Sequence, residues 1–523
     1  MVTGYLLGID VGTTNTKAIV YDPAIGKVVA VASRPTATHH PKPEWSEYDP
    51  AELWQGIVAT IREATAGRAA AIRGVAVGSM AEAGVPIDRA GHYLYPIIVW
   101  HDPRSEVQAR RWREWLGDER VFEITGQPIQ FKFSLNKLLW LRENAPQVLQ
   151  SLHKWLCIED FAIWKLSGAY ATDYSVASRT LAFDQRRLAW SEEMLARAGL
   201  SPAIFPTPHQ AGTVVGEVTA AAAAETGLRA GTPVTTGGHD HLCGSFAAGI
   251  TDKGMLLNSM GTAEACLLMA DRFTADARLL HHGYCHYAHI IPDHYVVHFG
   301  IVASGGFLDW VVQQTWPEAG ESAEGRRRSF AAALAAAAAV PPGSEGVFWL
   351  PHLRGGETPW RDEISKAAVV GLRDPHGRGH LVRAAIESLC YWMRENLEEM
   401  SAIVDVPEGG EIVAIGGSTR AALWLQIKAD VTGRPVRVVE VPEAVALGAA
   451  LLAGVGVGLF PSYQAAADSV VRSSTLYEPD PARVATYDHY YKEVYRALYT
   501  ALRDLNHRIH EVFWRGGKLA GRG

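Results

Sequence analysis

Two Gly-Thr turns that lie about 250 residues apart constrain the fold of this chain more than any other feature of its sequence. At the first turn, an apolar run ends at Asp10, Gly12-Thr13-Thr14-Asn15 follows, and a second apolar run leaves it. At the second turn, apolar residues 254–260 lead to Gly261-Thr262, and residues 265–269 return. Each pattern predicts a β-hairpin. A repeated hairpin predicts a duplicated fold, in which two like domains face each other across a cleft.

The tips of these hairpins have the chemistry of an anion-binding site. Backbone N–H groups and hydroxyls donate hydrogen bonds, and glycine lets the backbone come close to a ligand. Asp10, at the end of the first strand, is placed to hold Mg²⁺ or its water shell. A third turn, Gly416-Gly417-Ser418, follows a strand-like run over 411–415. We expect the three turns to converge on one nucleotide. The alternative for the first hairpin, taken alone, is an ordinary edge hairpin with a polar turn.

Chain length sets the number of domains. With 523 residues, the chain is too long for one core. We expect an N-terminal domain over 1–250, a C-terminal domain over 251–460 and a helical extension over 461–523 that packs on the body. Residues 103–200 have mainly helical patterns, which predicts a helical insertion on an α/β core.

Composition excludes several classes of partner. The formal net charge of −7 argues against nucleic acid and anionic membranes. The five cysteines are scattered without paired spacing, as is typical of reduced thiols in a cytosolic protein. No targeting segment or apolar run of membrane-spanning length is apparent in the sequence. We therefore predict a cytoplasmic enzyme that binds a small molecule, with no nucleic-acid or membrane partner; a homodimer stays open.

Two common nucleotide-binding motifs are absent from the sequence. No G-x-x-x-x-G-K-[ST] occurs, which excludes a P-loop enzyme. No G-x-G-x-x-G follows a strand, since the glycines of 454–458 end a predicted helix instead of opening one. The three Gly-rich turns therefore remain as the candidates for nucleotide binding.

Asp240 is the candidate for catalysis. It follows a strand over 233–236 and a turn that begins with Gly237-Gly238, at the expected mouth of the cleft. Phosphoryl transfer to a hydroxyl needs a carboxylate that orients the hydroxyl and accepts its proton. The alternative is that Asp240 only caps a helix that begins near Leu242.

Histidines raise the question of a metal site. His239 and His241 flank Asp240, but their spacing is poor for a joint site. A second group of histidines lies within 281–298, where zinc is one interpretation. Their intervals follow no known ligand pattern, and the strand-like runs there favour cross-strand or surface histidines.

Three further segments match the pattern of a known family. Residues 367–372 and 380–387, separated by a seven-residue gap, match a C-terminal signature. An N-terminal signature is matched at Ser134, Lys137, Trp140, Glu143 and Asn144, whereas Lys132 departs from it. Residues 416–420 are similar to an adenosine motif. In these segments the chain resembles the FGGY carbohydrate kinases, relatives of glycerol kinase and xylulokinase in the actin/hexokinase ATPase superfamily. The resemblance runs from about residue 5 to residue 455.

The resemblance implies two duplicated α/β domains of the ribonuclease-H-like, actin-like ATPase type that flank a cleft, with helical insertions. It implies ATP-dependent phosphorylation of a sugar or polyol hydroxyl, with Asp240 as general base and Asp10 at Mg²⁺. The ATP site would comprise Gly12, Thr13, Thr14, Asn15, Gly261, Thr262, Gly305, Gly416 and Gly417. The sugar site would comprise Glu82, Trp100, Asp102, Arg104, Asp240 and His241.

Departures from the family pattern limit the substrate. Ala81 replaces an arginine of glycerol kinases, which argues against glycerol, and 79–82 lacks the Gln-Met-His-Gly run of xylulokinases. A ketopentose, a tetritol or pentitol, and a deoxy-ketose stay open. Lys132 lies where glycerol kinases have a substrate-side tyrosine; a solvated surface pair with Glu82 is the alternative. The rival class is a non-catalytic or chaperone-like nucleotide-binding member of the superfamily, which Asp240, Glu82 and 102–104 disfavour.

Overall fold

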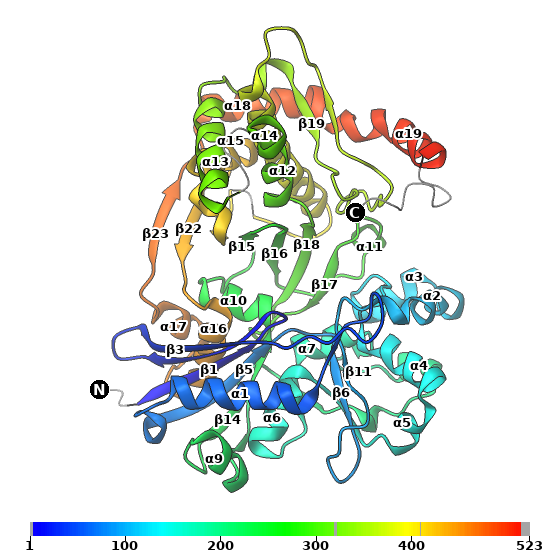
Figure 1. The fold of residues 1–523 in the computed structure, drawn as a ribbon, viewed down its shortest axis with the longest axis vertical. Helices are drawn as coiled ribbons and strands as arrows, with labels where there is room; N and C mark the ends of the chain where they lie inside the picture. Colours follow the sequence, from blue (N-terminus) through cyan, green and yellow to red (C-terminus); the bar gives the residue numbers. More distant parts are fainter. Residues whose placement is uncertain (1–3, 318–321, 408, 514–523) are drawn as a thin grey trace.

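The computed structural model describes residues 4–317, 322–407 and 409–513. The chain forms two lobes, each built on one mixed sheet (Figure 1). The first sheet has the spatial order β13 (Val214–Glu217), β14 (Pro233–His239), β5 (Ile72–Ser79), β1 (Tyr5–Val11), β2 (Asn15–Asp22), β3 (Lys27–Pro35). The second has the order β17 (Cys285–Ala288), β18 (Tyr295–Ile301), β16 (Glu264–Ala270), β15 (Leu256–Met260), β21 (Ile412–Ile415), β22 (Val436–Glu440), β23 (Ser473–Tyr477).

The two sheets repeat one topology. In the first, β1 pairs antiparallel with β2 and parallel with β5. In the second, β15 pairs antiparallel with β16 and parallel with β21. The next strands outward, β14 and β22, are again parallel to their neighbours. This correspondence confirms the predicted duplicated α/β fold.

Helices cover both faces of the first sheet. One face contacts α1 (Pro50–Ala64) and α6 (Ile158–Ser167), and α9 (Ala220–Thr226) packs beside them. α1 begins at Pro50 because the Asp49 side chain accepts hydrogen bonds from two backbone N–H groups of its first turn. The other face carries α16 (Ala444–Gly456), which contacts β1, β5 and β14. α16 comes close because Gly8 has no side chain: a Cβ there would lie 1.8 Å from the Ala446 carbonyl oxygen.

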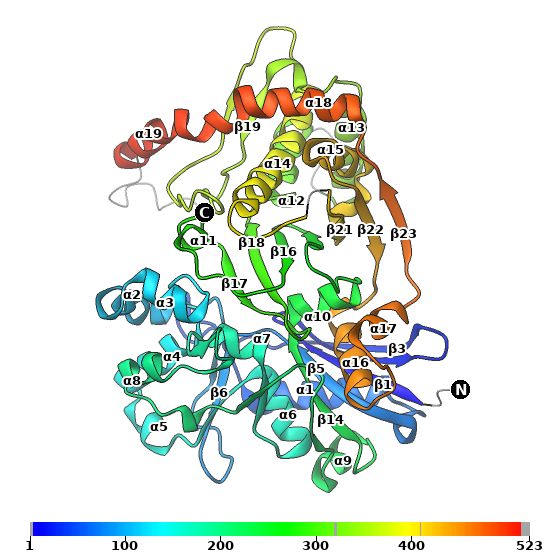
Figure 2. The ribbon, with the colours of Figure 1, turned by 180° about the vertical axis from the view of Figure 1, so that it is seen from behind.

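A shared core joins the lobes. α10 (Asp240–Ala247) packs on α16, and both lie between the two sheets (Figures 1 and 2). One apolar cluster contains Ile19 of the first sheet, Leu257 of the second and Leu447 of α16. Thus α16, although late in the sequence, packs against the first lobe, and α10 is held between the lobes.

The predicted helical insertion is confirmed between 103 and 200. Its helices surround their own apolar core, which includes Trp112, Leu138 and Leu195. They are α2 (Glu106–Trp115), α3 (Asp118–Thr125), α4 (Ser134–Asn144), α5 (Pro146–Ser151), α7 (Tyr174–Ala177) and α8 (Glu192–Ala198). The second lobe is completed by α11 (Ala277–His281), α12 (Gly305–Thr315), α13 (Ala323–Ala338), α14 (Arg378–Ser401) and α15 (Ala422–Thr432).

Short strand pairs connect these elements. They are β4 (Glu47–Tyr48) with β7 (Ile97–Ile98), β6 (Gly84–Ile87) with β8 (Lys154–Cys157), β9 (Ala171–Asp173) with β12 (Thr207–His209), β10 (Phe183–Asp184) with β11 (Ala189–Trp190), and β19 (Phe348–Leu350) with β20 (Ala368–Val370).

The C-terminal segment differs from the expected helical extension. It contains α17 (Tyr463–Asp468), α18 (Pro481–Tyr490), a π-helical turn over 491–495 and α19 (Arg496–Phe513). Between α17 and α18, β23 pairs with β22 as an edge strand, which the sequence prediction lacked. The predicted stretch 514–523 lies outside the described residues. Within the part of the chain that the structure describes, no helix is long and apolar enough to cross a membrane.

Candidate active site

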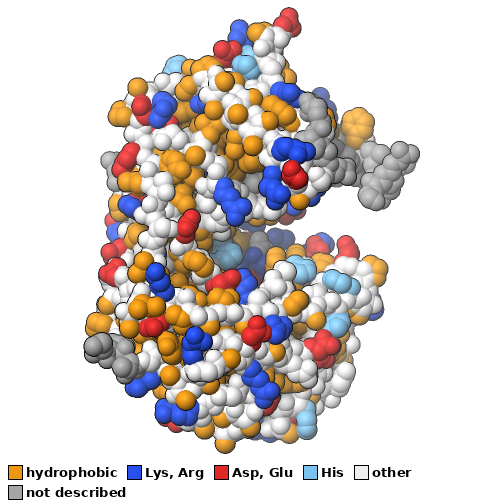
Figure 3. All heavy atoms as spheres, turned by 60° about the vertical axis from the view of Figure 1, so that its left-hand side comes forward, with side chains coloured by type: hydrophobic (Ala, Val, Ile, Leu, Met, Phe, Trp, Pro, Cys, Tyr) orange, Lys and Arg blue, Asp and Glu red, His pale blue; other side chains and the backbone are white. Residues whose placement is uncertain are grey.

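A deep hollow separates the lobes, and Figure 3 shows Lys, Arg and His side chains at its floor. The first hairpin, β1 and β2, belongs to one lobe, and the second hairpin, β15 and β16, belongs to the other (Figure 1). α10, which begins at Asp240, lies between the two sheets (Figures 1 and 2).

The tip of the first hairpin is a tight turn with free hydroxyls. The Gly12 N–H donates to the Asn15 carbonyl oxygen at 3.0 Å, and a Cβ on Gly12 would lie 3.0 Å from that same oxygen. Thr14 is exposed. The Trp100 indole donates to the Thr13 Oγ1 at 3.0 Å, so Trp100 is held against the first hairpin. This arrangement leaves the Thr14 hydroxyl available to a ligand.

Two of the predicted turns, at Gly261 and Gly416, come together in the second lobe with Gly305, which was predicted to lie near the nucleotide. The Gly305 N–H donates to the Gly261 carbonyl oxygen at 3.2 Å, and a Cβ on Gly305 would lie 2.4 Å from that oxygen. A Cβ on Gly416 would lie 2.5 Å from the Met260 carbonyl oxygen. Only glycine permits these approaches. Nothing lies within 4 Å of a Cβ on Gly417, so open space adjoins the predicted adenosine turn.

A buried ion pair lies under the second hairpin. Lys428 of α15 donates to Glu264 Oε1, and both side chains are fully buried. Lys428 also donates to Asn258 Oδ1 at 2.6 Å, while the Ser304 hydroxyl donates to Glu264 Oε2 at 2.6 Å. Ser304 directly precedes α12, and its N–H donates to the Thr262 carbonyl oxygen at 3.0 Å. The network therefore ties the Thr262 turn to α12 and α15.

Two carboxylates lie close enough to influence each other. Burial and the nearby Asp240 carboxylate raise the pKa of Asp10 to about 8, although Lys17 opposes the shift. A site with one or two carboxylates and room for phosphates is what Mg²⁺ uses in kinases. The raised pKa of Asp10 indicates an unmet need for positive charge, so the residues present fit Mg²⁺.

Asp240 begins α10 directly from β14, because β14 extends to His239. The expected turn over 237–240 and the helix start near Leu242 are therefore wrong by two to three residues. Asp240 Oδ1 accepts from the His241 N–H at 2.6 Å and lies 3.2 Å from His239 Nε2. Burial raises the pKa of Asp240 above its ordinary value of 3.8, and His241 opposes this.

Glu82 is buried in a strained backbone conformation. Its φ of 66° is in the left-handed region, which costs a residue with a side chain of this size free energy. Its carbonyl oxygen accepts from Ser134 Oγ at 2.9 Å and from Lys137 Nζ at 3.0 Å, which holds the backbone there. Its carboxylate accepts from Arg179 Nε at 2.8 Å and from Nη2. Although burial acts in the opposite direction, Arg179 and Lys132 lower the pKa of Glu82.

Arg179 is a site residue that the sequence prediction missed. It lies in a short 3₁₀ turn over 178–180 and is 3% exposed. Its guanidinium also donates to Gln127 Oε1 at 3.1 Å. Glu82 is therefore not part of a solvated surface pair, as one alternative held.

Asp102 and Arg104 are buried in a hydrogen-bond network of their own. Asp102 accepts from Arg104 Nε at 2.8 Å and from Nη2 at 2.6 Å, and the Ser46 N–H donates to it at 2.6 Å. Arg104 also pairs with Glu47 at 2.6 Å and lies over the Trp45 ring at 3.8 Å. Because these polar groups are occupied, this pair holds the loop that carries Trp100.

Histidines surround Asp240 without forming a metal centre. The ring of His241 lies 5.2 Å from that of His239 and 5.4 Å from that of His298 on β18. Burial lowers the pKa of both His239 and His298 well below 6.5. His286 of β17 and His298 of β18 lie on paired antiparallel strands, as the cross-strand expectation predicted, whereas His289 is buried outside these strands. Within the described ranges, no group of three His, Cys, Asp or Glu side chains has an arrangement that could hold a metal ion.

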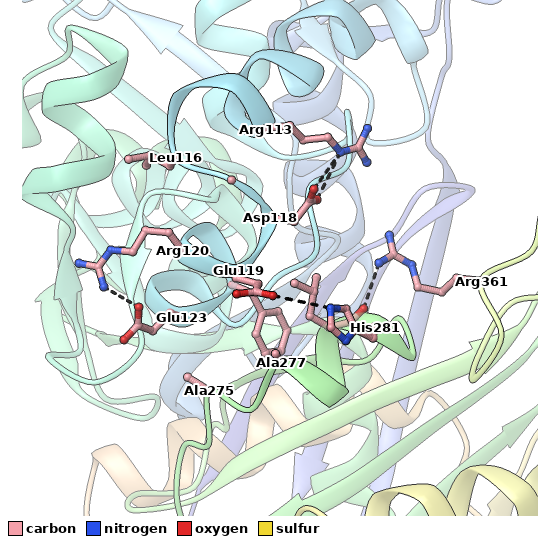
Figure 4. Close-up of a pocket in the computed structure, with 13 residues that line it drawn as sticks. Arg113, Leu116, Asp118, Glu119, Arg120, Glu123, Ala275, Ala277, His281 and Arg361 are labelled. Carbon is pink, nitrogen blue, oxygen red and sulfur yellow. Dashed lines mark hydrogen bonds and ion pairs between the residues drawn. The ribbon is translucent and has the colours of Figure 1, made fainter.

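A separate cavity of about 850 Å³ lies between the lobes at α3 and α11. Figure 4 shows Glu119 of α3 and His281 of α11 pointing toward each other, with Nε2 and Oε1 3.9 Å apart. Arg361 reaches the same cavity and donates to the Leu280 carbonyl oxygen at 3.0 Å. None of the predicted site residues lines this cavity, so we do not assign the active site to it.

The glycine turns of one lobe and the carboxylates of the other belong to two like α/β halves joined by α10. This fold and site define a kinase that transfers a phosphoryl group to an alcohol. A model of the FGGY carbohydrate kinase N-terminal domain matches residues 5–247, and a model of the C-terminal domain of that family matches 256–457. The chain belongs to the FGGY family of carbohydrate kinases, which are ATP-dependent. The chaperone-like alternative is therefore wrong.

Individual relatives agree with this assignment. The chain is 29% identical to the xylulose kinase of Bacillus subtilis over 510 residues, 96% of this chain and 98% of that protein. A crystal structure of xylulose kinase from Rhodospirillum rubrum has a TM-score of 0.88 and 31% identity, covering 96% of this chain and 100% of the other. A gluconate kinase from Lactobacillus acidophilus, with a TM-score of 0.86 and 22% identity over 96% of this chain and 99% of the other, is similar in fold.

Proposed function

We propose that this kinase transfers the γ-phosphoryl group of MgATP, bound between the lobes, to a hydroxyl of a sugar substrate other than glycerol, with Asp240 as general base. The observation that carries the proposal is the electrostatic position of Asp240. Glu82 and Arg179 on the sugar side influence its pKa, and it in turn influences Asp10 on the phosphate side. A base that orients a hydroxyl toward a phosphoryl group has to lie between these two sides.

The proposed step needs little covalent help from the protein. The substrate hydroxyl oxygen forms a bond to the γ-phosphorus, the bond to the leaving ADP oxygen breaks, and Asp240 takes the hydroxyl proton. Mg²⁺, when bound near Asp10, would neutralise phosphate charge. We assign phosphate binding to the turn residues Gly12, Thr13, Thr14, Asn15, Gly261 and Thr262. We assign nucleoside binding to Gly305, Gly416 and Gly417.

On the sugar side we propose that Glu82, Trp100 and His241 line the substrate pocket. Asp102 and Arg104 act through the loop that positions Trp100, because their own polar groups are occupied.

A screen for ADP release tests the function. The purified chain with MgATP is offered a panel of ketoses, aldoses, polyols and sugar acids, and ADP formation is compared with the background ATPase rate. We expect at least one compound to stimulate release. If none of them does, the kinase activity proposed for this site is refuted.

A variant tests the base. Asp240→Asn keeps the size of the side chain but removes the basic group, so we expect turnover to fall by about 10²–10⁴-fold. Nucleotide binding, measured by calorimetry, should stay within about twofold. Asp504→Asn, in which the carboxylate is 82% exposed on α19, is the matched control and should keep wild-type turnover. Unchanged turnover in Asp240→Asn would remove Asp240 from the mechanism.

A further inference from the structure

Lys132 is a cation without a partner on the sugar side of the site. It lies between α3 and α4 and is partly buried. Among the described residues, its ammonium group makes no hydrogen bond or ion pair, and it lies 5.6 Å from the centre of the Phe133 ring. Burial and the Arg179 guanidinium lower the pKa of Lys132. An ammonium group held this way costs free energy unless an anion joins it.

The neighbouring charges do not supply that anion. The Glu82 carboxylate already accepts two hydrogen bonds from Arg179, so this pair is balanced within itself. Lys137 donates to the Glu82 carbonyl oxygen and not to the carboxylate, and burial lowers the pKa of Lys137 to about 7, so Lys137 carries only part of a positive charge at neutral pH. The Glu82–Arg179 pair therefore leaves the positive charge of Lys132 on the sugar side unbalanced.

Glu357 of the second lobe is the other carboxylate that faces Lys132. Burial raises the pKa of Glu357 to about 7. At neutral pH it therefore carries only part of a negative charge, and it balances Lys132 incompletely.

The charge of Lys132 also affects the residues around Asp240, the proposed base. It acts on His239 and His298, which flank the pocket around Asp240 and which burial keeps neutral. A substrate whose hydroxyl meets Asp240 therefore has Lys132 within electrostatic range of its remaining atoms. Lys132 is also the position where the chain departs from the family signature, so this cation is a property of this chain.

We infer that the substrate is a sugar acid, a polyhydroxy carboxylate, in which a hydroxyl meets Asp240 and the carboxylate pairs with Lys132. This inference rests on the proposed function and names the substrate class of the same site. A carboxylate carries one negative charge, which equals the single charge left over at Lys132, whereas a phosphate monoester carries nearly two. Ammonium and guanidinium groups bind carboxylates through charge-assisted hydrogen bonds.

Matched pairs of compounds test the inference. ADP release is measured with gluconate against sorbitol and with xylonate against xylitol, and glucose 6-phosphate and xylulose are added as further arms. We expect kcat/KM for the best acid to exceed that for its neutral partner by about tenfold or more. A neutral compound faster than every acid, or activity with the sugar phosphate alone, overturns the inference but keeps the kinase. No stimulation by any compound refutes the proposed function itself.

Variants of Lys132 then separate charge from structure. Lys132→Met should raise KM for the acid by about tenfold or more, with a smaller change in kcat and no change in KM for the neutral partner. Lys132→Arg should keep most of the affinity for the acid. Lys27→Met, at an exposed position on β3, is the control. Equal changes in KM for the acid and the neutral compound would show a structural role only and would overturn the assignment.

Discussion

At the scale of single residues, Asp10 couples protons to metal binding. Its pKa of about 8 exceeds the ordinary value of 3.8, so the folded chain without a cation holds a proton there that the unfolded chain releases. The stability that this proton gives is fully present below pH 3.8 and is lost as the pH rises toward about 8. Mg²⁺ competes with the same proton, so the affinity for Mg²⁺ must change in the opposite direction.

We predict that the affinity for Mg²⁺ rises with pH until about pH 8, by up to about tenfold per pH unit. Calorimetric titration of the chain with MgCl₂ between about pH 6 and about pH 9 measures this slope. Asp10→Asn should abolish the slope and most of the binding, whereas Asp22→Asn, at the far end of β2, should keep both. An affinity that does not depend on pH would contradict the assignment of Asp10.

The two acidic residues that were predicted from their place in the sequence share one property: they lie at the end of a strand or directly after it. Asp10 and Asp240 lie at strand ends, and backbone order alone brings strand ends together. Arg179 is separated from Glu82 by 97 residues, and packing of the helical insertion decides their pairing. A signal was present, since Arg179 interrupts the apolar run of 176–183, and an arginine in such a run needs a buried partner. The sequence did not indicate that this partner is Glu82.

At the scale of secondary-structure elements, the ion pair of Glu264 and Lys428 holds three elements around the second hairpin. Removal of one charge leaves the other buried without compensation, which costs more than the intact pair contributes. We predict that Lys428→Met lowers the free energy of unfolding by about 3–5 kcal/mol. It should also raise KM for ATP, because Ser304 and the Thr262 turn depend on Glu264.

Urea unfolding and steady-state kinetics check this prediction. The double variant Glu264→Gln/Lys428→Met removes both charges and keeps an acceptor for Ser304, so it should recover part of the lost stability. Arg437→Met breaks an exposed ion pair with Glu411 in the same sheet and should cost about 1 kcal/mol or less. Similar losses in Lys428→Met and Arg437→Met would show that burial of the pair has no special effect.

Secondary-structure elements were predicted well where the pattern of apolar residues and turns indicates how neighbouring strands are connected. In both lobes, two apolar strand segments flank a turn that contains glycine, and the structure has these hairpins at the expected positions. A helix over 444–453 was also predicted, and α16 extends it to Gly456. The lobe that this helix contacts was not predicted, because an apolar helix surface does not indicate which sheet it packs against. β23 was missed because Ser473–Tyr477 is short and mostly exposed, so its pairing with β22 depends on the neighbouring strand.

At the scale of the whole molecule, two of the places where the lobes contact each other bear on how the lobes are held together. One is the shared core of α10 and α16. The other is a backbone contact: Gly126, which ends α3, accepts a hydrogen bond from the His286 N–H of β17 at 2.7 Å. Gly126 has a φ of 64°, and a Cβ there would lie 1.6 Å from the His286 carbonyl oxygen. This second contact fixes the helical insertion against the second sheet.

We predict that Gly126→Ala loosens the lobes and lowers turnover. The matched control is Gly168→Ala, because Gly168 ends α6 with a φ of 77° and nothing lies within 4 Å of its Cβ. Both substitutions strain a left-handed helix end by about 1–2 kcal/mol. Only Gly126→Ala also forces β17 away, so it should lose more stability in urea and show a larger radius of gyration in X-ray scattering. Equal losses in the two variants would mean that the contact between Gly126 and β17 contributes nothing to holding the lobes, and that the shared core and the other contacts between the lobes set their arrangement.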